Sequence, residues 1–248
     1  MVKEATTLGS AGYDVTVLTI SNSARFAGMD AELAQGLPFK RIALDHTQGN
    51  RTGIFMQRLR TWGARKLCRH LGHESPQSLG PAAALLRAAR SCPADLIIAH
   101  TEIPLWAAQY LIRDGRRVAV DIEDWYSEDL LPDARQTRPL RLLRFAEGFA
   151  LNNAAYVSVT SDSMADALVA TYGSPRPMVL RNTFPLPTQT RTDNPSPSDH
   201  PAIIWFSQTI GPGRGLEEFF DAWTLTKKAS RVFLLGDEHP AYVGSLLA

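Results

Sequence analysis

The feature that most constrains the fold is segment 202–237, in which two apolar runs flank a glycine-rich turn and a helix. A short apolar strand is predicted over residues 203–206 and a second buried strand over 232–235. The turn reads GPGRG over 211–215, and an amphipathic helix follows it. This is the pattern of a βαβ unit whose first turn can hold a phosphate at the N-terminus of the helix.

The turn also carries a cation. Free backbone N–H groups and the helix dipole favour an anion at this place, and the guanidinium of Arg214 would lie where a pyrophosphate binds. Glycines let the backbone approach such a ligand closely. We therefore predict a diphosphate site formed by Gln208, Thr209, Gly211, Gly213, Arg214 and Gly215. The alternative is that Arg214 is a surface side chain and that the glycines only form the turn.

Strand-like and helix-like runs alternate along the rest of the chain. The predicted strands are 15–20, 39–44, 96–99, 118–122, 156–160 and 178–180, and the predicted helices are 2–11, 54–71, 81–90, 105–112, 140–151 and 162–172. Ser161 stands at the N-cap position of the last of these helices. The alternation predicts an α/β fold with a parallel sheet that helices cover on both faces.

Residues 183–201 are rich in Pro, Ser, Thr and Asp, which is typical of an interdomain linker. We therefore predict two Rossmann-like, doubly wound domains, 1–182 and 202–248. No strand precedes helix 2–11, and two strands with one helix cannot cover both faces of a sheet. We expect the first strand of domain 1 and most of domain 2 to be missing. The alternative is a short protein whose second half packs on the first or on a partner.

Composition limits the kind of partner and the compartment. The formal net charge is +1, which gives no overall field for nucleic acid. Cys68 and Cys92 lie in no metal or redox spacing, as expected of reduced thiols. No apolar run approaches the roughly 20 residues that span a bilayer. We predict a cytoplasmic protein that binds no nucleic acid.

Six segments together resemble a known family. They are GYDVTVLTI, DLIIAHTEIPLWAA, VAVDIEDWYSEDL, AAYVSVTSDSMADALVATYG, MVLRNTFPL and SQTIGPGRGLEEFFDAW. Their order and separations resemble glycosyltransferase family 4, the retaining sugar transferases of the GT-B fold. The chain departs from the family pattern at Glu123, where T-V-H-D has histidine, and at Thr183, where V-I-x-N-G has glycine. The first strand with its glycine-rich loop and the E-x7-E motif are absent.

The resemblance implies a reaction. A sugar passes from a nucleotide-sugar donor to a carbohydrate or lipid-linked acceptor, with retention at the anomeric carbon. Arg214 would hold the leaving diphosphate. Cationic side chains and helix dipoles then stabilise the developing charge, so we expect no metal ion and no cofactor besides the donor. The alternatives are a nucleotide-sugar epimerase of the same two-domain layout and a truncated, non-catalytic binding chain.

Polar residues follow two of the predicted strands. Glu123 and Asp124 come directly after strand 118–122, where open α/β sheets bind their ligands. His100 follows strand 96–99 in the same way. The resemblance places all three in the cleft, and we predict them as catalytic residues. The alternatives are a solvated strand-end cluster for the acids and a hydrogen-bonded structural role for the histidine.

Asp121 and Glu123 also form a D-x-E pair, a pattern that holds Mn²⁺ in sugar transferases of the other fold class. We expect the two side chains to point to opposite sides of the strand unless the strand ends between them. For that reason we predict no metal site here.

Residues 54–71 predict a basic amphipathic helix. Arg58, Arg65 and Arg69 lie near one face, and Phe55, Leu59 and Trp62 lie beside them. Such a helix can dock on anionic lipid headgroups, which would place the protein at the inner face of the membrane. The alternative is a surface helix with its apolar stripe in the core and its arginines in water.

Overall fold

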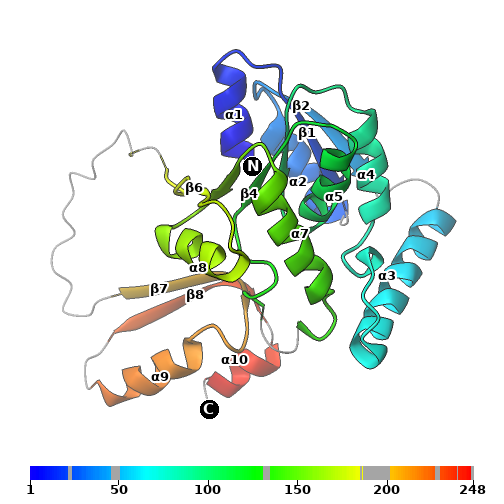
Figure 1. Cartoon of the computed structure of the whole chain (residues 1–248). Helices are drawn as coiled ribbons and strands as arrows, with labels where there is room; N and C mark the ends of the chain where they lie inside the picture. The colour runs from blue at the N-terminus through cyan, green and yellow to red at the C-terminus, as the bar shows by residue number, and fades with distance from the viewer. Residues whose placement is uncertain are drawn as a thin grey trace. The chain divides into compact units, whose positions relative to one another are not determined.

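The structure is a computed structural model that describes residues 1–21, 24–45, 51–130, 135–184, 186, 202–226, 230–238 and 240–246. The chain divides into two compact units, Met1–Thr183 and Phe184–Ala248. Most of the predicted linker, 183–201, lies outside the described residues. Figure 1 labels the helices and strands of both units.

In unit 1, strands alternate with helices as the sequence predicts. The order is α1 (Val2–Ser10), β1 (Thr16–Ser21), α2 (Ala24–Ala34), β2 (Lys40–Asp45), α3 (Arg51–Leu71), the 3-10 turn η1 (Pro76–Ser78), α4 (Ala82–Ser91), β3 (Ile97–His100), α5 (Glu102–Arg113), β4 (Val118–Ile122), α7 (Leu140–Asn153), β5 (Val157–Val159), α8 (Asp162–Tyr172) and β6 (Met178–Val179). The predicted Ser161 cap is confirmed, because its hydroxyl accepts a hydrogen bond from the Met164 amide at 3.2 Å. Helix α2 and η1 were not among the predicted elements.

The strands of unit 1 are parallel, which confirms the predicted α/β class. One sheet has the order β3-β4-β5-β6, and β1 pairs with β2 in a second sheet. Within the described residues the two sheets are hydrogen-bonded separately, so unit 1 does not have the single sheet that the alternation suggested. Leu18 of β1 nevertheless packs against the hydrophobic core of the larger sheet. A two-stranded sheet needs such packing because it is marginal by itself.

The core of unit 1 is built on β4 and on the helices beside it. Both faces of β4 are buried, and so are the inward faces of α5, α7 and α8. The largest fully buried apolar side chains of this region are Leu105, Val118, Val120, Ile122, Leu143, Val159 and Leu168. This packing fixes the carboxyl ends of β3 and β4, where the predicted catalytic residues lie.

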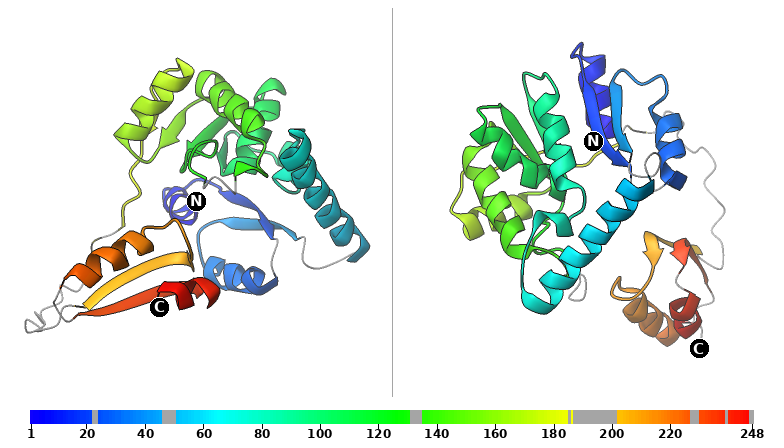
Figure 2. Two further views of the ribbon diagram at one scale, coloured as in Figure 1. Left: turned by 90° about the horizontal axis from the view of Figure 1, so that it is seen from below. Right: turned by 90° about the vertical axis from the view of Figure 1, so that its right-hand side faces the viewer.

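Helix α3 is at the edge of unit 1. Figure 1 and the left view of Figure 2 show it standing away from the β3–β6 sheet. Its residues pack mainly on η1. Ala64 and Cys68 are its buried side chains among those described. The helix therefore presents most of its surface outward.

Unit 2 contains β7 (Ala202–Ile210), α9 (Leu216–Leu225), β8 (Arg231–Glu238) and α10 (Pro240–Leu246). β7 and β8 are parallel, with a register shift between Phe206 and Thr209. The predicted βαβ unit is thus present, and both strands are longer than expected. Figure 1 and the right view of Figure 2 show α9 and α10 on the same side of the two strands.

Among the described residues, no helix combines the length and the apolar character needed to cross a membrane.

Candidate active site

The predicted catalytic residues of unit 1 lie where two neighbouring strands end. β3 and β4 are parallel, and their register pairs His100 with Asp121. The chain leaves β4 at Ile122, so Glu123 and Asp124 begin the loop that follows. Because parallel strands end at the same edge of a sheet, the pairing brings the imidazole and the acidic side chains together.

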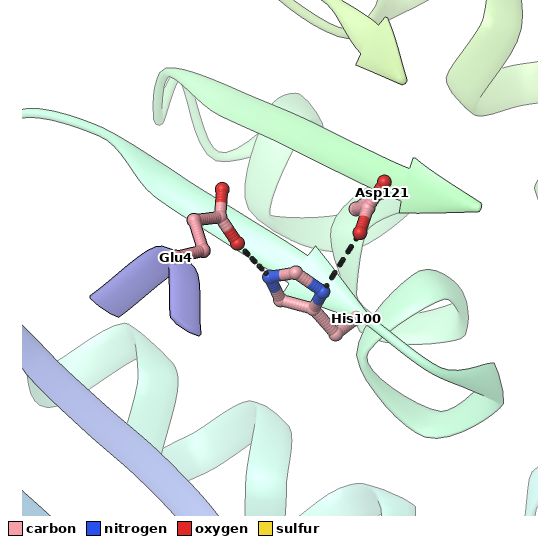
Figure 3. A group of neighbouring side chains, drawn as sticks. All are labelled: Glu4, His100 and Asp121. Carbon is pink, nitrogen blue, oxygen red and sulfur yellow. Dashed lines mark ion pairs between the residues drawn. The ribbon is translucent and has the colours of Figure 1, made fainter. Parts of the chain in front are cut away.

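His100 is surrounded by carboxylates. Its Nε2 lies 2.8 Å from Glu4 Oε2, and its Nδ1 lies 3.2 Å from Asp121 Oδ2. Figure 3 shows the imidazole between these two side chains, which come from α1 and β4. Nδ1 is also 3.2 Å from Glu123 Oε1. The structure therefore joins two of the three predicted catalytic residues, His100 and Glu123, in one cluster.

These carboxylates hold a proton on the imidazole. Burial by itself would lower the pKa of His100, but the hydrogen bonds to Asp121 and Glu4 outweigh it and raise the pKa to about 9. At neutral pH both ring nitrogens therefore carry hydrogen and donate to carboxylates. In this state His100 can orient acids or stabilise negative charge, but it cannot accept a proton as a general base.

The D-x-E pair of Asp121 and Glu123 was rejected as a metal site because its side chains were expected to point to opposite sides of the strand, unless the strand ended between them. Asp121 and Glu123 do not diverge, since both reach Nδ1 of His100 at 3.2 Å. β4 ends at Ile122, between the two residues, which is the case that the expectation excepted. Burial raises the pKa of Asp121, yet hydrogen bonds from His100 and from the Ser158 hydroxyl, 2.6 Å away, lower it further, so the net shift is downward.

The ligand atoms of Glu4, His100 and Asp121 lie within 4.8 Å of one another, a spacing at which three groups can hold a metal ion. A metal ion bound there would have to displace a proton from His100, which these carboxylates stabilise. The predicted absence of a metal stays a prediction.

Asp124, the third predicted catalytic residue, is exposed in the loop after β4. Glu4 was not found from the sequence, because it lies on α1, far from His100 along the chain, and nothing near it marks the contact. Asp121 could have been found from its place near the carboxyl end of β4, the edge at which open α/β sheets bind ligands.

The glycine-rich turn of unit 2 is more open than the cluster of unit 1. Gln208 and Thr209, which were predicted as part of the diphosphate site, lie within β7. Gly213 and Gly215 have φ of 71° and 77°, a conformation that favours glycine, and Gly215 is the N-cap of α9. The geometry explains why the turn needs glycines at these two places.

Two contacts inside the turn involve the groups that would bind a diphosphate. A guanidinium nitrogen of Arg214 donates to the Ser207 hydroxyl at 3.0 Å, and the Gly213 amide donates to Glu217 Oε1 at 3.4 Å. The first contact holds Arg214 over the end of β7. In the second, a carboxylate of the chain occupies an amide that a phosphate oxygen could accept from. The role of the six predicted turn residues stays a prediction.

Residues 3–183 match the family of glycosyl transferase 4-like domains, and the chain belongs to this family. The match confirms the resemblance found from the sequence. No curated protein matches the chain significantly.

Two solved structures of Arabidopsis thaliana UGT89C1 are similar to the chain. The complex with UDP-L-rhamnose has 13% sequence identity and a TM-score of 0.47 over 96% of this chain and 64% of that one. The complex with quercetin has 11% identity and a TM-score of 0.42 over 94% and 65%. The chain thus spans about two-thirds of the length of these structures. Both TM-scores are below 0.5, so the family match carries the assignment.

Proposed function

We propose that the protein is a glycosyltransferase that moves a sugar from a nucleotide-sugar donor to an acceptor hydroxyl. The observation that carries this proposal is the match of residues 3–183 to the glycosyl transferase 4-like family. The cluster of His100, Glu123 and Asp121 at the carboxyl ends of β3 and β4 supports it, because ligands of open α/β sheets bind at this edge.

In the proposed reaction the acceptor oxygen bonds to the anomeric carbon on the same face of the sugar from which the diphosphate oxygen departs, so the configuration at this carbon is retained. The nucleoside diphosphate leaves with the electron pair, and the acceptor hydroxyl loses its proton to a base. Arg214 and the backbone N–H groups of the turn stabilise the charge of the leaving diphosphate. Glu123, held by His100, orients the acceptor hydroxyl, and the exposed Asp124 is the carboxylate free to take the proton.

The proposal includes retention at the anomeric carbon, with no metal ion and with the donor as the sole small-molecule requirement. Retention rests on the family resemblance. Two measurements check these points. The configuration of the product is read from the anomeric proton coupling in its NMR spectrum. Turnover in the presence of EDTA should equal turnover without it, and an activity restored by Mg²⁺ or Mn²⁺ would refute metal independence.

Nucleotide binding tests the role of the turn. UDP, GDP and ADP are titrated into the purified chain by calorimetry, alongside Arg214→Ala. Loss of a charge-assisted contact should weaken binding of the preferred diphosphate by roughly 10- to 100-fold. Arg231→Ala, at the opposite end of the βαβ unit at the start of β8, is the matched control and should bind as the unsubstituted chain does. If no diphosphate binds, this chain by itself is not a sugar transferase.

The proposed acceptor side includes an anionic lipid surface, on which α3 rests. Phe55, Leu59 and Trp62 are 63%, 45% and 60% exposed, so this apolar stripe does not pack in the core. Arg58 and Arg69 are exposed on the same helix. Arg65 is exposed as well, and its Nε donates to the Ser78 carbonyl at 2.9 Å. An apolar stripe with cations beside it suits the boundary between headgroups and acyl chains.

Sedimentation with vesicles tests this contact. The chain should bind vesicles that contain anionic phospholipid and should bind neutral phosphatidylcholine vesicles far less, because the arginines require negative charge. The double variant Phe55→Ser with Trp62→Ser should lose most of the binding. Leu225→Ser removes an apolar side chain that is 83% exposed outside α3 and is the control. Equal binding of the double variant and the control would refute the contact.

A further inference from the structure

A carboxylate is buried behind the candidate site. Glu147 of α7 is 0% exposed. Its Oε1 accepts from the Ser127 amide at 3.0 Å, and its Oε2 accepts from the Ser127 hydroxyl at 2.8 Å and from the Tyr172 hydroxyl at 2.5 Å. Burial raises the pKa of Glu147 more than these donors lower it. A buried carboxylate is tolerated here because hydrogen-bond donors surround it. Loss of these hydrogen bonds would leave buried polar groups unpaired.

Two of the three donors belong to one loop residue. Ser127 lies in the loop that follows β4, four residues after Glu123 and three after Asp124. Its side chain is also 0% exposed. The loop has no strand or helix over 123–130, so it lacks the ladder of backbone hydrogen bonds that would fix it. The contacts of Ser127 with Glu147 supply an anchor in place of that ladder.

The same loop also contacts Thr101, which follows β3, through Tyr126. This side chain is 6% exposed, and its hydroxyl accepts from the Thr101 amide at 3.1 Å. Thr101 follows His100 and has φ of 69°, which is unusual for a β-branched residue. Such a backbone persists where its surroundings hold it. The loop after β4 therefore holds the residue next to His100.

We propose that Glu147 is a positioning residue of the candidate active site: through Ser127 and Tyr126 it fixes Glu123 against His100 and holds the backbone of Thr101. Its importance for catalysis rests on the proposed function, whereas the positioning itself does not. Glu147 lies behind the loop and is fully buried, so it acts without touching a substrate.

The test substitutes Glu147→Gln in the full chain. An amide keeps the shape but replaces one acceptor oxygen with a donor group, which cannot receive the Ser127 or Tyr172 hydrogens. The amides of Ser127 and Thr101 should exchange with solvent about tenfold faster, the effect of losing one hydrogen bond. The NMR titration of His100 should shift to lower pH, because Glu123 is no longer held beside Nδ1.

Two further variants separate positioning from general stability. Glu74→Gln removes a carboxylate that accepts from the amides of Arg141 and Leu142 at 3.2 and 2.9 Å at the start of α7, and it should leave both readouts unchanged. Ser127→Ala removes only the hydroxyl donor and should give a smaller change in the same direction as Glu147→Gln. It also serves as the test if Glu147→Gln does not fold. Unaltered exchange and His100 titration in these two variants would overturn the proposal.

Activity adds an independent readout. If the protein transfers sugar, Glu147→Gln should raise KM for the acceptor while calorimetric binding of the diphosphate stays the same, because the turn of unit 2 is not altered. If the unsubstituted chain transfers no sugar, the proposed function is refuted. Whether Glu147 positions Glu123 and Thr101 would then be decided by the amide exchange and by the His100 titration. An unchanged acceptor KM with normal sugar transfer would limit Glu147 to a structural role.

Discussion

The strand β4 of unit 1 and the strand β7 of unit 2 are both followed by candidate site residues, but they are buried very differently. Ile122 of β4 is 0% exposed, whereas Ile204 of β7 is 64% exposed. β4 is covered on both faces, and β7 alternates between exposed and half-buried residues. The residues after β4 are accordingly held by contacts with Met1, with His100 and Thr101 at the end of β3, with Thr160 and with Glu147 of α7. The turn after β7 relies on its own glycines and on short-range contacts.

The difference indicates how each site would work. In unit 1, charged groups are arranged before any ligand arrives, which is what electrostatic stabilisation of a reaction requires. In unit 2, the amide and guanidinium groups of the turn have partners in the flanking elements, Glu217 of α9 and Ser207 of β7, that a diphosphate would have to replace. We therefore expect substitutions in unit 1 to cost stability and substitutions in the turn to change affinity.

The largest expected effect is a difference in stability between a substitution in β4 and the same substitution in β7. Ile122→Ala should lower the free energy of unfolding of unit 1 by about 2–5 kcal/mol, because it leaves a cavity in a closely packed core. Ile204→Ala should change the stability of unit 2 by less than about 0.5 kcal/mol, as expected of an exposed position. Urea unfolding gives the values, and amide hydrogen exchange of peptides from β4 and β7 shows which unit is affected.

Equal losses of unfolding free energy in Ile122→Ala and Ile204→Ala would contradict the difference in burial between β4 and β7. Such a result would mean that the face of β7 carrying Ile204 is covered in solution. Leu216→Ala is a positive control inside unit 2, because Leu216 is 0% exposed. This substitution should cost about as much as Ile122→Ala if unit 2 folds around α9.

The second prediction concerns the charge on His100. A folded-state pKa of about 9, above the ordinary 6.5, gives stability that is fully present below pH 6.5 and is lost as the pH rises through 9. We expect a loss on the order of 2 kcal/mol over this range, reduced because Glu4 and Glu123 are partly exposed. The groups that face the imidazole are Glu4, Asp121, Glu123 and, through Glu123, the Met1 amino group.

The measurement is the free energy of unfolding between pH 6 and 10. His100→Gln should remove most of its decline, and His70→Gln, which changes an exposed histidine of α3, should not. An equal decline in the unsubstituted chain and in His100→Gln would show that other groups cause it. The cluster would then contribute little, and the contrast with the turn would weaken.

Much of the fold was predictable because it follows from local patterns. Strand 118–122 and helix 162–172 have the predicted bounds. Both are strongly marked, the strand by a run of β-branched residues and the helix by the Ser161 cap. Helix α2 was missed although Phe26, Met29 and Leu33 stand at helical spacing, because most of its other apolar residues are alanines, which mark no face. The division of unit 1 into two sheets depends on long-range pairing, which no local pattern encodes.

The candidate site was predictable in part for the same reason. His100 and Glu123 were found from their places after two strands, because the ends of parallel strands meet at one edge. Glu4 and Glu147 were not, since each makes its contacts with residues distant in sequence. A glutamate on a helix normally indicates a solvated face, and only the packing of α7 reveals that Glu147 is buried.

The smallest expected effect lies in the turn of unit 2. Glu217→Gln removes a negative charge from the first turn of α9 and weakens the competition for the Gly213 amide. If this turn binds the donor, affinity for the preferred nucleoside diphosphate should rise roughly two- to fivefold, the usual size of a charge effect at a helix N-terminus. Calorimetry with UDP, GDP and ADP measures it.

Glu218→Gln is the matched control, because Glu218 is also in the first turn of α9 but Glu217 is the acid bound to Gly213. The control should gain less affinity than Glu217→Gln, since it removes charge without releasing the amide. Equal gains would mean that charge repulsion acts alone and that the Gly213 amide does not bind the ligand. A loss of affinity in Glu217→Gln would mean that the carboxylate shapes the turn for binding, so that unit 2 is prearranged in the same way as unit 1.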